Sequence, residues 1–265
     1  MHISAYCDRI QYQGSLDPSI ETLRGLQRAH LYSVPFENLD VALGRPLRMD
    51  EAGLVDKIVT HRRGGFCYEL NGLFSRLLRA LGYRVTLLNA RGMNDDGSLG
   101  IDFDHMALRV ACPGDPSVGY LVDVGWGNGP LEPLHLVAGD DQVQGDHTFR
   151  IDLEGSLLQL YERSEDGRWV GQYVFTLQPH DYADFNPACQ YHQTSPGSIF
   201  TQKRICSRYT PEGRVTLSQS GSPGEVKLII TRDGQREERL VVGEEAVRRA
   251  LKDYFDIVLD DEAGR

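Results

Sequence analysis

The stretch Arg62-Arg63-Gly64-Gly65-Phe66-Cys67-Tyr68-Glu69-Leu70-Asn71 places a cysteine where a glycine turn meets the start of a helix. The apolar residues that follow it have helical spacing; they are Leu70, Leu73, Phe74, Leu77, Leu78 and Leu81. Free backbone N–H groups and the positive end of the helix dipole favour negative charge at such a position. Arg62, Arg63 and His61 add positive charge nearby, so we expect the thiolate form of Cys67 to be favoured. The competing interpretation is a buried structural cysteine.

A nucleophilic cysteine needs a base, and the base needs a group that orients it. His105 opens a run typical of a strand, Phe103-Asp104-His105-Met106-Ala107-Leu108-Arg109-Val110. Asp123 is the carboxylate within a second apolar run, Tyr120-Leu121-Val122-Asp123-Val124-Gly125-Trp126-Gly127, and the alternation turns it inward, where a carboxylate must be paired or hydrogen-bonded. Taken singly, Asp123 is also explained as a cap of the following turn, and His105 as a core histidine bonded to a carbonyl. Taken together with Cys67, they favour a catalytic triad.

Composition excludes several classes of protein. The chain has 265 residues, 40% of them hydrophobic and 25% charged, which suits two or three compact subdomains. Its five cysteines are scattered without a Cys-x-x-Cys pair, which argues for a reducing compartment, the cytoplasm, and against a disulfide framework or a metal site. A net charge of −10 argues against nucleic-acid or anionic-membrane partners. No apolar run approaches the roughly 20 residues of a membrane span, and residues 1–9 lack the apolar core of a signal peptide.

The hydrophobic period changes along the chain. Up to about residue 84 it is helical, and it predicts helices at 18–31, with Asp17 or Ser15 as cap, at 49–61, and from Cys67 to about 81. From there to about residue 177 apolar and polar residues alternate with a period of two, which predicts strands at 84–88, 106–110, 119–124 and 169–175. The last part predicts strands at 214–217, 226–231 and 238–242 before a helix at 244–254.

Two further stretches are distinctive: Val34-Pro35-Phe36-Glu37-Asn38-Leu39-Asp40 and Tyr191-His192-Gln193-Thr194-Ser195-Pro196-Gly197-Ser198-Ile199-Phe200-Thr201-Gln202-Lys203. The RGGFCYELN, DHMALRV and YLVDVGWG segments resemble the three active-site segments of the arylamine N-acetyltransferase family. The two further stretches resemble that family's PFENLD signature and its TSPxSxFT segment. The matches follow one another in order over nearly the whole chain.

The resemblance implies an α+β fold with a papain-like catalytic core formed by Cys67, His105 and Asp123. Its parts are an N-terminal helical bundle carrying the cysteine (1–84), a central β-barrel-like domain carrying the histidine and aspartate (85–190), and a C-terminal α/β lid (191–265). It also implies the reaction: acetyl-CoA as donor co-substrate with no permanently bound cofactor, an acyl-cysteine intermediate, ping-pong kinetics, and an arylamine or arylhydrazine as acceptor.

The resemblance assigns substrate contacts to particular residues. Phe36, Phe103 and Trp126 are expected to form an apolar slot for the acceptor, whereas Phe66 is expected to be core. Trp126 departs from the family, which often has phenylalanine in DVGFG, so the indole is expected to narrow or reshape the slot.

Contacts with coenzyme A are expected from Tyr191 and from Ser198. The family's donor contacts also use hydroxyls at positions that here are Gly197 and Ile199, which have none. Lys203, Arg204 and Arg208 offer charge for phosphates, although solvated surface is an equal explanation of them. Glu37 and Arg63 are predicted to form a buried pair that supports the Cys67 loop.

Three alternatives stay open at this point. A related amide synthase would use the same triad to release or cyclise a polyketide, bound to an acyl carrier protein, onto an aromatic amine. A cysteine hydrolase or transglutaminase-like enzyme would release acid without any amine. A non-catalytic binding module would have a structural Cys67 that iodoacetamide does not alkylate at neutral pH.

Overall fold

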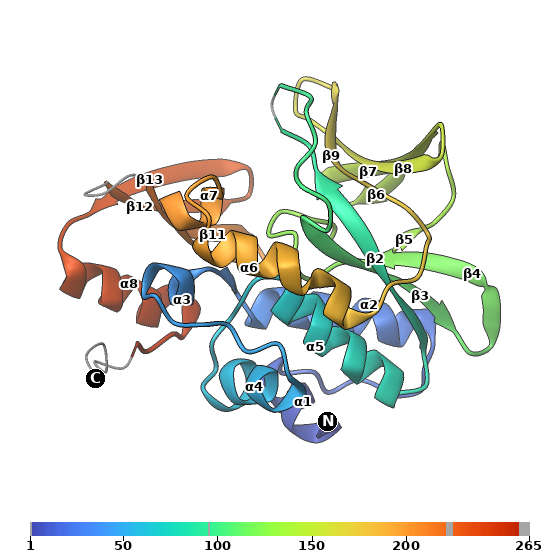
Figure 1. Ribbon diagram of the computed structural model, residues 1–265, viewed down its shortest axis with the longest axis horizontal. Helices are drawn as coiled ribbons and strands as arrows, with labels where there is room; N and C mark the ends of the chain where they lie inside the picture. The colour runs from blue at the N-terminus through green and yellow to red at the C-terminus, as the bar shows by residue number, and fades with distance from the viewer. Residues whose placement is uncertain (1, 95, 221–224, 260–265) are drawn as a thin grey trace.

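Helix α5, Cys67–Ala80, lies at the centre of the molecule, between the two sheets and the N-terminal helices (Figure 1). The computed structural model describes residues 2–94, 96–220 and 225–259. Five of the six apolar residues that predict α5 are fully buried, while Leu81, just past its end, is partly buried. Several polar side chains on the other faces of α5 are buried too, among them Glu69 and Asn71. Buried polar side chains need hydrogen-bond partners, and these two have them: Glu69 accepts from Lys57, and Asn71 donates to Asp123.

Short helices surround α5 on one side. They are α1 Ile3–Arg9, α2 Ile20–Ser33, α3 Leu39–Ala42, α4 Glu51–Leu54 and the π-helix η1 Val55–Thr60. The helix predicted at 49–61 is therefore an α-turn capped by Asp50 that continues as π-helix. The predicted cap of α2 is wrong: the side chain of Ser19, rather than Asp17 or Ser15, accepts the N–H of Thr22.

An eight-stranded antiparallel sheet curls into the barrel-like part. In spatial order its strands are β5 Leu134–His135, β4 Asp115–Val122, β3 His105–Cys112, β2 Arg84–Gly92, β9 Trp169–Phe175, β8 Leu157–Arg163, β7 His147–Glu154 and β6 Gln142–Gln144. The alternation in β3 has a direct meaning. Ala107 points into the barrel core, whereas Met106 and Leu108 point outward to the core around α5.

Glutamine side chains join the two edge strands of this sheet. Gln142 both accepts from the backbone N–H of His135, at 2.7 Å, and donates to its carbonyl, at 3.0 Å. Gln144 does the same with Glu132, at 3.0 and 2.9 Å. Each glutamine amide makes the pair of hydrogen bonds that a residue of a neighbouring strand would make. The backbone groups at these sheet edges are therefore bonded without direct strand pairing.

The second sheet has five strands and is completed by the N-terminal part of the chain. Its order is β1 Phe36–Glu37, β10 Lys203–Thr210, β11 Gly213–Ser220, β12 Val226–Arg232 and β13 Gln235–Val241. Helix α8, Glu244–Phe255, packs on it through Val247, Leu251 and Phe255. Because β1 pairs with β10, the PFENLD segment leads directly from this sheet towards the Cys67 loop.

The segment between the sheets contains η2 Tyr182–Phe185, α6 Asn186–Thr194 and α7 Ile199–Gln202. Helix α6 lies beside the start of α5, where the ring of His192 stacks on that of Tyr68 (Figure 1). The α+β class, the barrel-like sheet and the helical part are as predicted, whereas the boundaries near 84 and 190 stay predictions. No helix among the described residues is long and apolar enough to cross a membrane.

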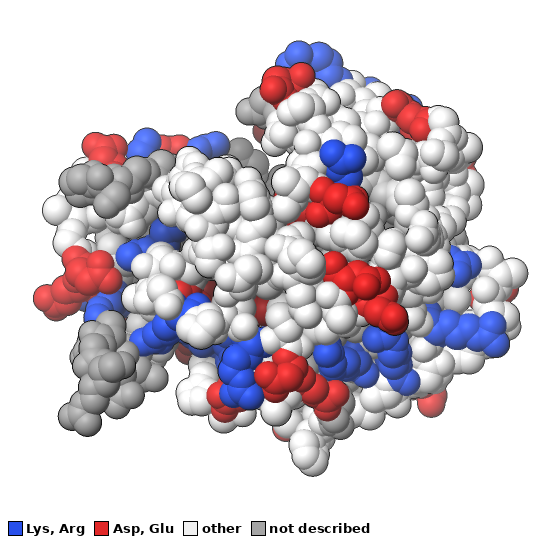
Figure 2. Space-filling model, viewed as in Figure 1, with Lys and Arg blue, Asp and Glu red and all other residues white. Residues whose placement is uncertain are grey.

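Acidic and basic side chains are interspersed over the helical part of the face in Figure 2. In this view no extended area of one sign covers the described residues. One uncharged area of the same face lies over α6 and α7, and another lies over the barrel-like part.

Candidate functional site

Cys67 is the first residue of α5 and is 8% exposed. Its backbone approaches the segment after β4 so closely that only glycine fits opposite: a Cβ on Gly125 would lie 2.6 Å from the Cα of Cys67. On the other side, a Cβ on Gly64 would lie 1.9 Å from the carbonyl oxygen of Pro35. The glycines of the two motifs therefore place the cysteine against its partners.

His105 begins β3 and contacts both other members of the predicted triad. Its Nε2 lies 2.6 Å from Oδ2 of Asp123, and both side chains are almost completely buried. The side chain of Cys67 lies close enough to His105 to favour the charged form of the ring and raise its pKa. Because Asp123 occupies Nε2, Nδ1 is the ring nitrogen left for the thiol. The structure thus brings together the three residues that the sequence singled out.

Asp123 follows β4 and is enclosed by donors. Besides His105, it accepts from Asn71 Nδ2 at 2.9 Å, from the N–H of Gly125 at 2.8 Å and from the hydroxyl of Tyr173 at 3.1 Å. The turn-capping explanation of Asp123 is therefore correct too, through one oxygen, while the other oxygen holds the histidine.

These contacts fix the charges in the site. Burial raises the pKa of Asp123, but the His105 charge and the hydrogen bonds outweigh it, so the pKa is lowered overall. Burial opposes the charge on His105, but Asp123 and the Cys67 side chain favour it and raise the pKa of His105 to about 10. An imidazolium beside the cysteine is the arrangement that keeps a thiolate nucleophile ready.

The basic residues that precede Cys67 do not contribute as predicted. Arg62 extends away and pairs with Asp256 at 2.9 Å, and the exposed His61 faces Asp56. Arg63 is neutralised by buried carboxylates. The positive charge beside Cys67 comes instead from His105 and from the start of α5.

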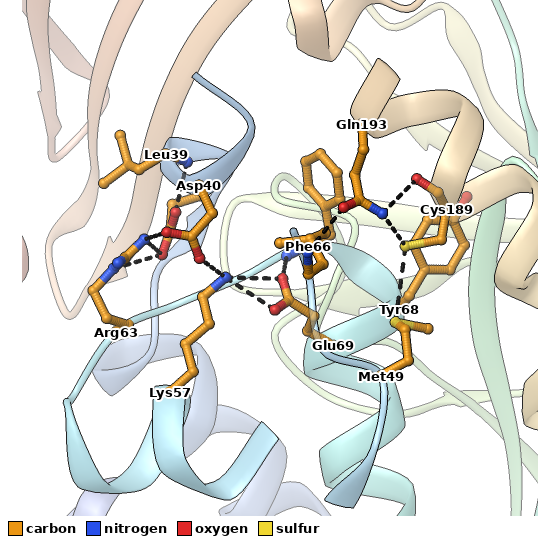
Figure 3. A network of polar contacts seen from close by, with 12 residues as sticks. Leu39, Asp40, Met49, Lys57, Arg63, Phe66, Tyr68, Glu69, Cys189 and Gln193 are labelled. Atoms are coloured by element: carbon orange, nitrogen blue, oxygen red, sulfur yellow. Dashed lines mark hydrogen bonds and ion pairs between the residues drawn. The ribbon is translucent and has the colours of Figure 1, made fainter. Parts of the chain in front are cut away.

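A buried ion-pair network surrounds the segment that precedes Cys67 (Figure 3). Arg63 contacts Glu37 at 2.8 Å, which is the predicted pair, and also Asp40 at 3.0 Å. The second oxygen of Glu37 accepts the N–H of Leu39. Glu37, which is fully buried, and Asp40 together hold the pKa of Arg63 well above its usual range despite burial. The loop is thus fixed to β1 and α3.

The sequence did not indicate the other half of this network. Lys57 of η1 lies between Asp40, at 2.7 Å, and Glu69, at 2.9 Å. Glu69 in turn accepts the N–H of Phe66, the residue before the nucleophile, at 2.9 Å. Figure 3 shows the side chains of Lys57, Asp40 and Glu69 pointing toward one another. The π-helix therefore contributes a cation to the support of the Cys67 loop.

A pocket of about 550 Å³ opens beside Cys67 and His105. Phe36, Trp126, Tyr191 and Ser198 line it, as their predicted roles require. The ring of Trp126 packs edge-on against His105, with centroids 4.9 Å apart, and its Nε1 donates to Gln172. The indole therefore forms a wall of the pocket immediately beside His105.

Two other aromatic residues are placed away from the pocket lining. Phe103 is absent from that lining; its ring packs edge-on against His180 and Phe185, and its carbonyl accepts the hydroxyl of Tyr68. An acceptor contact of Phe103 therefore has no support from its position. Phe66 stacks between other rings in the core, as expected.

The predicted donor contacts are unequal. Tyr191 lines the pocket, whereas the hydroxyl of Ser198 is already used: it accepts the N–H of Phe200 at the start of α7 and lies 2.9 Å from Nδ1 of His192. Arg204 and Arg208 face Glu244 and the carbonyl of Tyr254. Neither they nor Lys203 line the pocket.

Several residues of the site were not predicted. Asn71 has a visible signal, because it lies four residues after Cys67 on the same helix face, and it bonds both Asp123 and the N–H of Val124. Tyr173 and Arg214 reach the site from strands far away in sequence, which no local pattern reveals. Arg214 lines the pocket beside Asn128 and adds a guanidinium to it.

Comparison with known proteins gives one consistent result. The profile of the N-acetyltransferase family matches residues 19–263. The pineal gland isozyme NAT-3 arylamine N-acetyltransferase of Gallus gallus is 35% identical over 281 residues, covering 98% of this chain and 95% of that protein. The solved structure of Mycobacterium marinum arylamine N-acetyltransferase has a TM-score of 0.89 at 33% identity and covers 99% of this chain and 95% of that one. The same enzyme in complex with CoA gives 0.88 at 32% identity, with 99% and 95% covered.

Proposed function

This chain belongs to the arylamine N-acetyltransferase family, and we propose that it transfers an acetyl group from acetyl-CoA, through an acetyl-Cys67 intermediate, to the nitrogen of an arylamine or arylhydrazine. The observation that carries the proposal is the contact of His105 with both Cys67 and Asp123 at the edge of an aromatic-lined pocket. The donor is supported by the relative whose structure contains CoA.

In the first half-reaction the thiolate of Cys67 attacks the thioester carbonyl. The negative charge that develops on oxygen is stabilised by backbone N–H groups in the first turn of α5, where the helix dipole also favours it. The carbon–sulfur bond to CoA then breaks, the leaving thiolate takes the proton of His105, and the acetyl group remains on Cys67.

In the second half-reaction the amine attacks acetyl-Cys67. His105, now neutral, accepts the proton that the nitrogen loses, while Asp123 stabilises the cation that forms. The thiolate of Cys67 leaves, and the imidazolium–thiolate pair is restored. Transfer between two sulfurs is close to thermoneutral, whereas amide formation runs downhill, so the second step drives the cycle.

The polarity of the pocket is consistent with these substrates. Phe36 and Trp126 offer apolar faces to an aryl ring, and Arg214 offers a cation to a phosphorylated donor. The amide synthase that acts on carrier-bound chains receives no support from the relatives compared above. We infer that the enzyme works in the cytoplasm, which the free state of all five cysteines supports.

Steady-state kinetics test this function. Initial rates with varied acetyl-CoA and varied 4-aminobenzamide should give parallel double-reciprocal lines, because CoA leaves before the amine binds. The Asp123→Asn variant should keep the geometry and lose most of kcat, since the imidazolium is no longer stabilised. Intersecting lines would contradict the acyl-enzyme, and acid release without amine would point to a hydrolase.

A further inference from the structure

A second histidine lies in the wall of the same pocket, outside the triad. His192 of α6 is 5% exposed, and its Nε2 lies 3.0 Å from Oδ1 of Asp104. Its Nδ1 lies 2.9 Å from the hydroxyl of Ser198. Asp104, His192 and Ser198 all line the pocket that Cys67 and His105 open into.

The carboxylate of Asp104 is built into this wall. Its Oδ2 accepts the N–H of Gly92 at 3.1 Å. A Cβ on Gly92 would lie 2.9 Å from that oxygen, and one on Gly100 would lie 2.4 Å from it, so two glycines leave the room that the carboxylate fills. Tyr68, the neighbour of the nucleophile, donates its hydroxyl to the backbone carbonyl of Asp104 and fixes the segment.

His192 and Asp104 can each make a further hydrogen bond. Although Nε2 of His192 is close to Asp104, the contact lacks hydrogen-bond alignment, and the buried Nε2 has no aligned partner among the described residues. A bare lone pair on Nε2 would face a carboxylate, so this nitrogen carries the proton and is a donor. Each carboxylate oxygen can accept a further bond. The wall therefore presents an acceptor and a donor side by side, about 3.0 Å apart.

We propose that Asp104 and His192 form the polar end of the acceptor site and select aromatic amines that carry a neutral group able to donate and accept, such as a carboxamide, over those that carry a carboxylate. The N–H of a carboxamide bonds Asp104, and its carbonyl accepts from His192. A carboxylate has no proton to offer and meets the negative charge of Asp104. This inference rests on the acetyl transfer proposed above and adds the class of acceptor.

The test compares two acceptors of nearly the same shape, 4-aminobenzamide and 4-aminobenzoate. In a ping-pong reaction, kcat/KM for the acceptor reports the second half-reaction alone, so donor binding does not enter the comparison. We expect the wild-type enzyme to favour the benzamide, and Asp104→Asn to reduce the ratio of the two kcat/KM values about tenfold by removing the like charge. Asp104→Ser, which is neutral but differently shaped, should move the ratio in the same direction.

Asp102→Asn is the matched control. Asp102 lies in the same segment, is exposed, bonds Asn89 and does not line the pocket. Asp102→Asn should leave the ratio of the two kcat/KM values at its wild-type value. Because each variant's ratio is compared with the wild-type ratio, the intrinsic difference in nucleophilicity between the two amines cancels. An unchanged ratio in both Asp104 variants overturns the inference. If kcat/KM also falls by the same factor with both acceptors, the role of Asp104 is purely structural. If the wild type forms acetyl-Cys67 and acetylates both amines, the proposed function survives that outcome; if it acetylates no amine, both proposals fail.

Discussion

Replacing Arg63 by methionine should destabilise the protein strongly, because it breaks a buried ion network from one side. Arg63 holds Glu37, whose side chain is 0% exposed, and Asp40, whose side chain is 11% exposed. Without the guanidinium, Asp40 keeps its ion pair with Lys57, whereas Glu37 loses its ion pair and keeps the N–H of Leu39. Removing one partner of a buried pair costs about 3–5 kcal/mol, and for 265 residues about 4 kcal/mol corresponds to a decrease in Tm of roughly 7 °C.

The neighbouring residue provides the control for this prediction. Arg62→Met makes the same change one residue away, where the guanidinium is 44% exposed and pairs with the exposed Asp256. Such a pair contributes only a few tenths of a kcal/mol, so Tm should change by less than about 1 °C. Differential scanning calorimetry and urea unfolding of both variants measure the difference. Equal effects of the two substitutions would refute the claim that the Cys67 loop is supported by a buried network.

Three further predictions concern the site. The imidazolium of His105 should titrate near pH 10, because its pKa is raised to about 10 in the folded state, and the stability that this charge contributes is complete below about pH 6.5 and is lost as the pH rises through 10. In an NMR titration of the isotope-labelled ring, Asp123→Asn should lower the midpoint. An unchanged midpoint would show that Asp123 is not the group that raises the pKa of His105. Gly125→Ala should abolish most activity and cost about 1–3 kcal/mol of stability because its Cβ would meet the backbone of the nucleophile, whereas Gly114→Ala, which meets nothing within 4 Å, should do neither. Trp126→Phe should raise kcat/KM for naphthyl over phenyl amines by widening the pocket, and unchanged selectivity would show that the indole does not bound the acceptor.

The triad could be predicted from the sequence because its signals are local. The leucine spacing after Cys67 marks a helix, and the alternation around His105 and before Asp123 marks strands, so each residue could be placed on an element. The inward-facing carboxylate in an apolar run needed a partner, and in the structure that partner is His105. The resemblance to a family then gave the order of the parts and the chemistry.

What the sequence did not reveal depends on contacts between distant segments. Lys57 and Glu69 are ordinary charged residues of their helices, and only the packing of η1 beside α5 makes them a buried pair. Likewise, His192 lies next to Tyr191 in the segment predicted to contact coenzyme A, and nothing local indicates its contact with Asp104, which is almost ninety residues away in sequence. The basic run before Cys67 misled for the same reason, since its charges are cancelled by carboxylates brought in from β1, α3 and the segment after α8.

The most direct test of the account is intact-protein mass spectrometry with acetyl-CoA. After mixing, the wild-type protein should gain the mass of one acetyl group, Cys67→Ala should gain none, and addition of an arylamine should return the wild type to its original mass with the acetylated amine in solution. A protein that gains no acetyl group while Cys67 is still rapidly alkylated by iodoacetamide would contradict acetyl-CoA as donor. An acetyl group gained equally by Cys67→Ala would contradict the nucleophile itself.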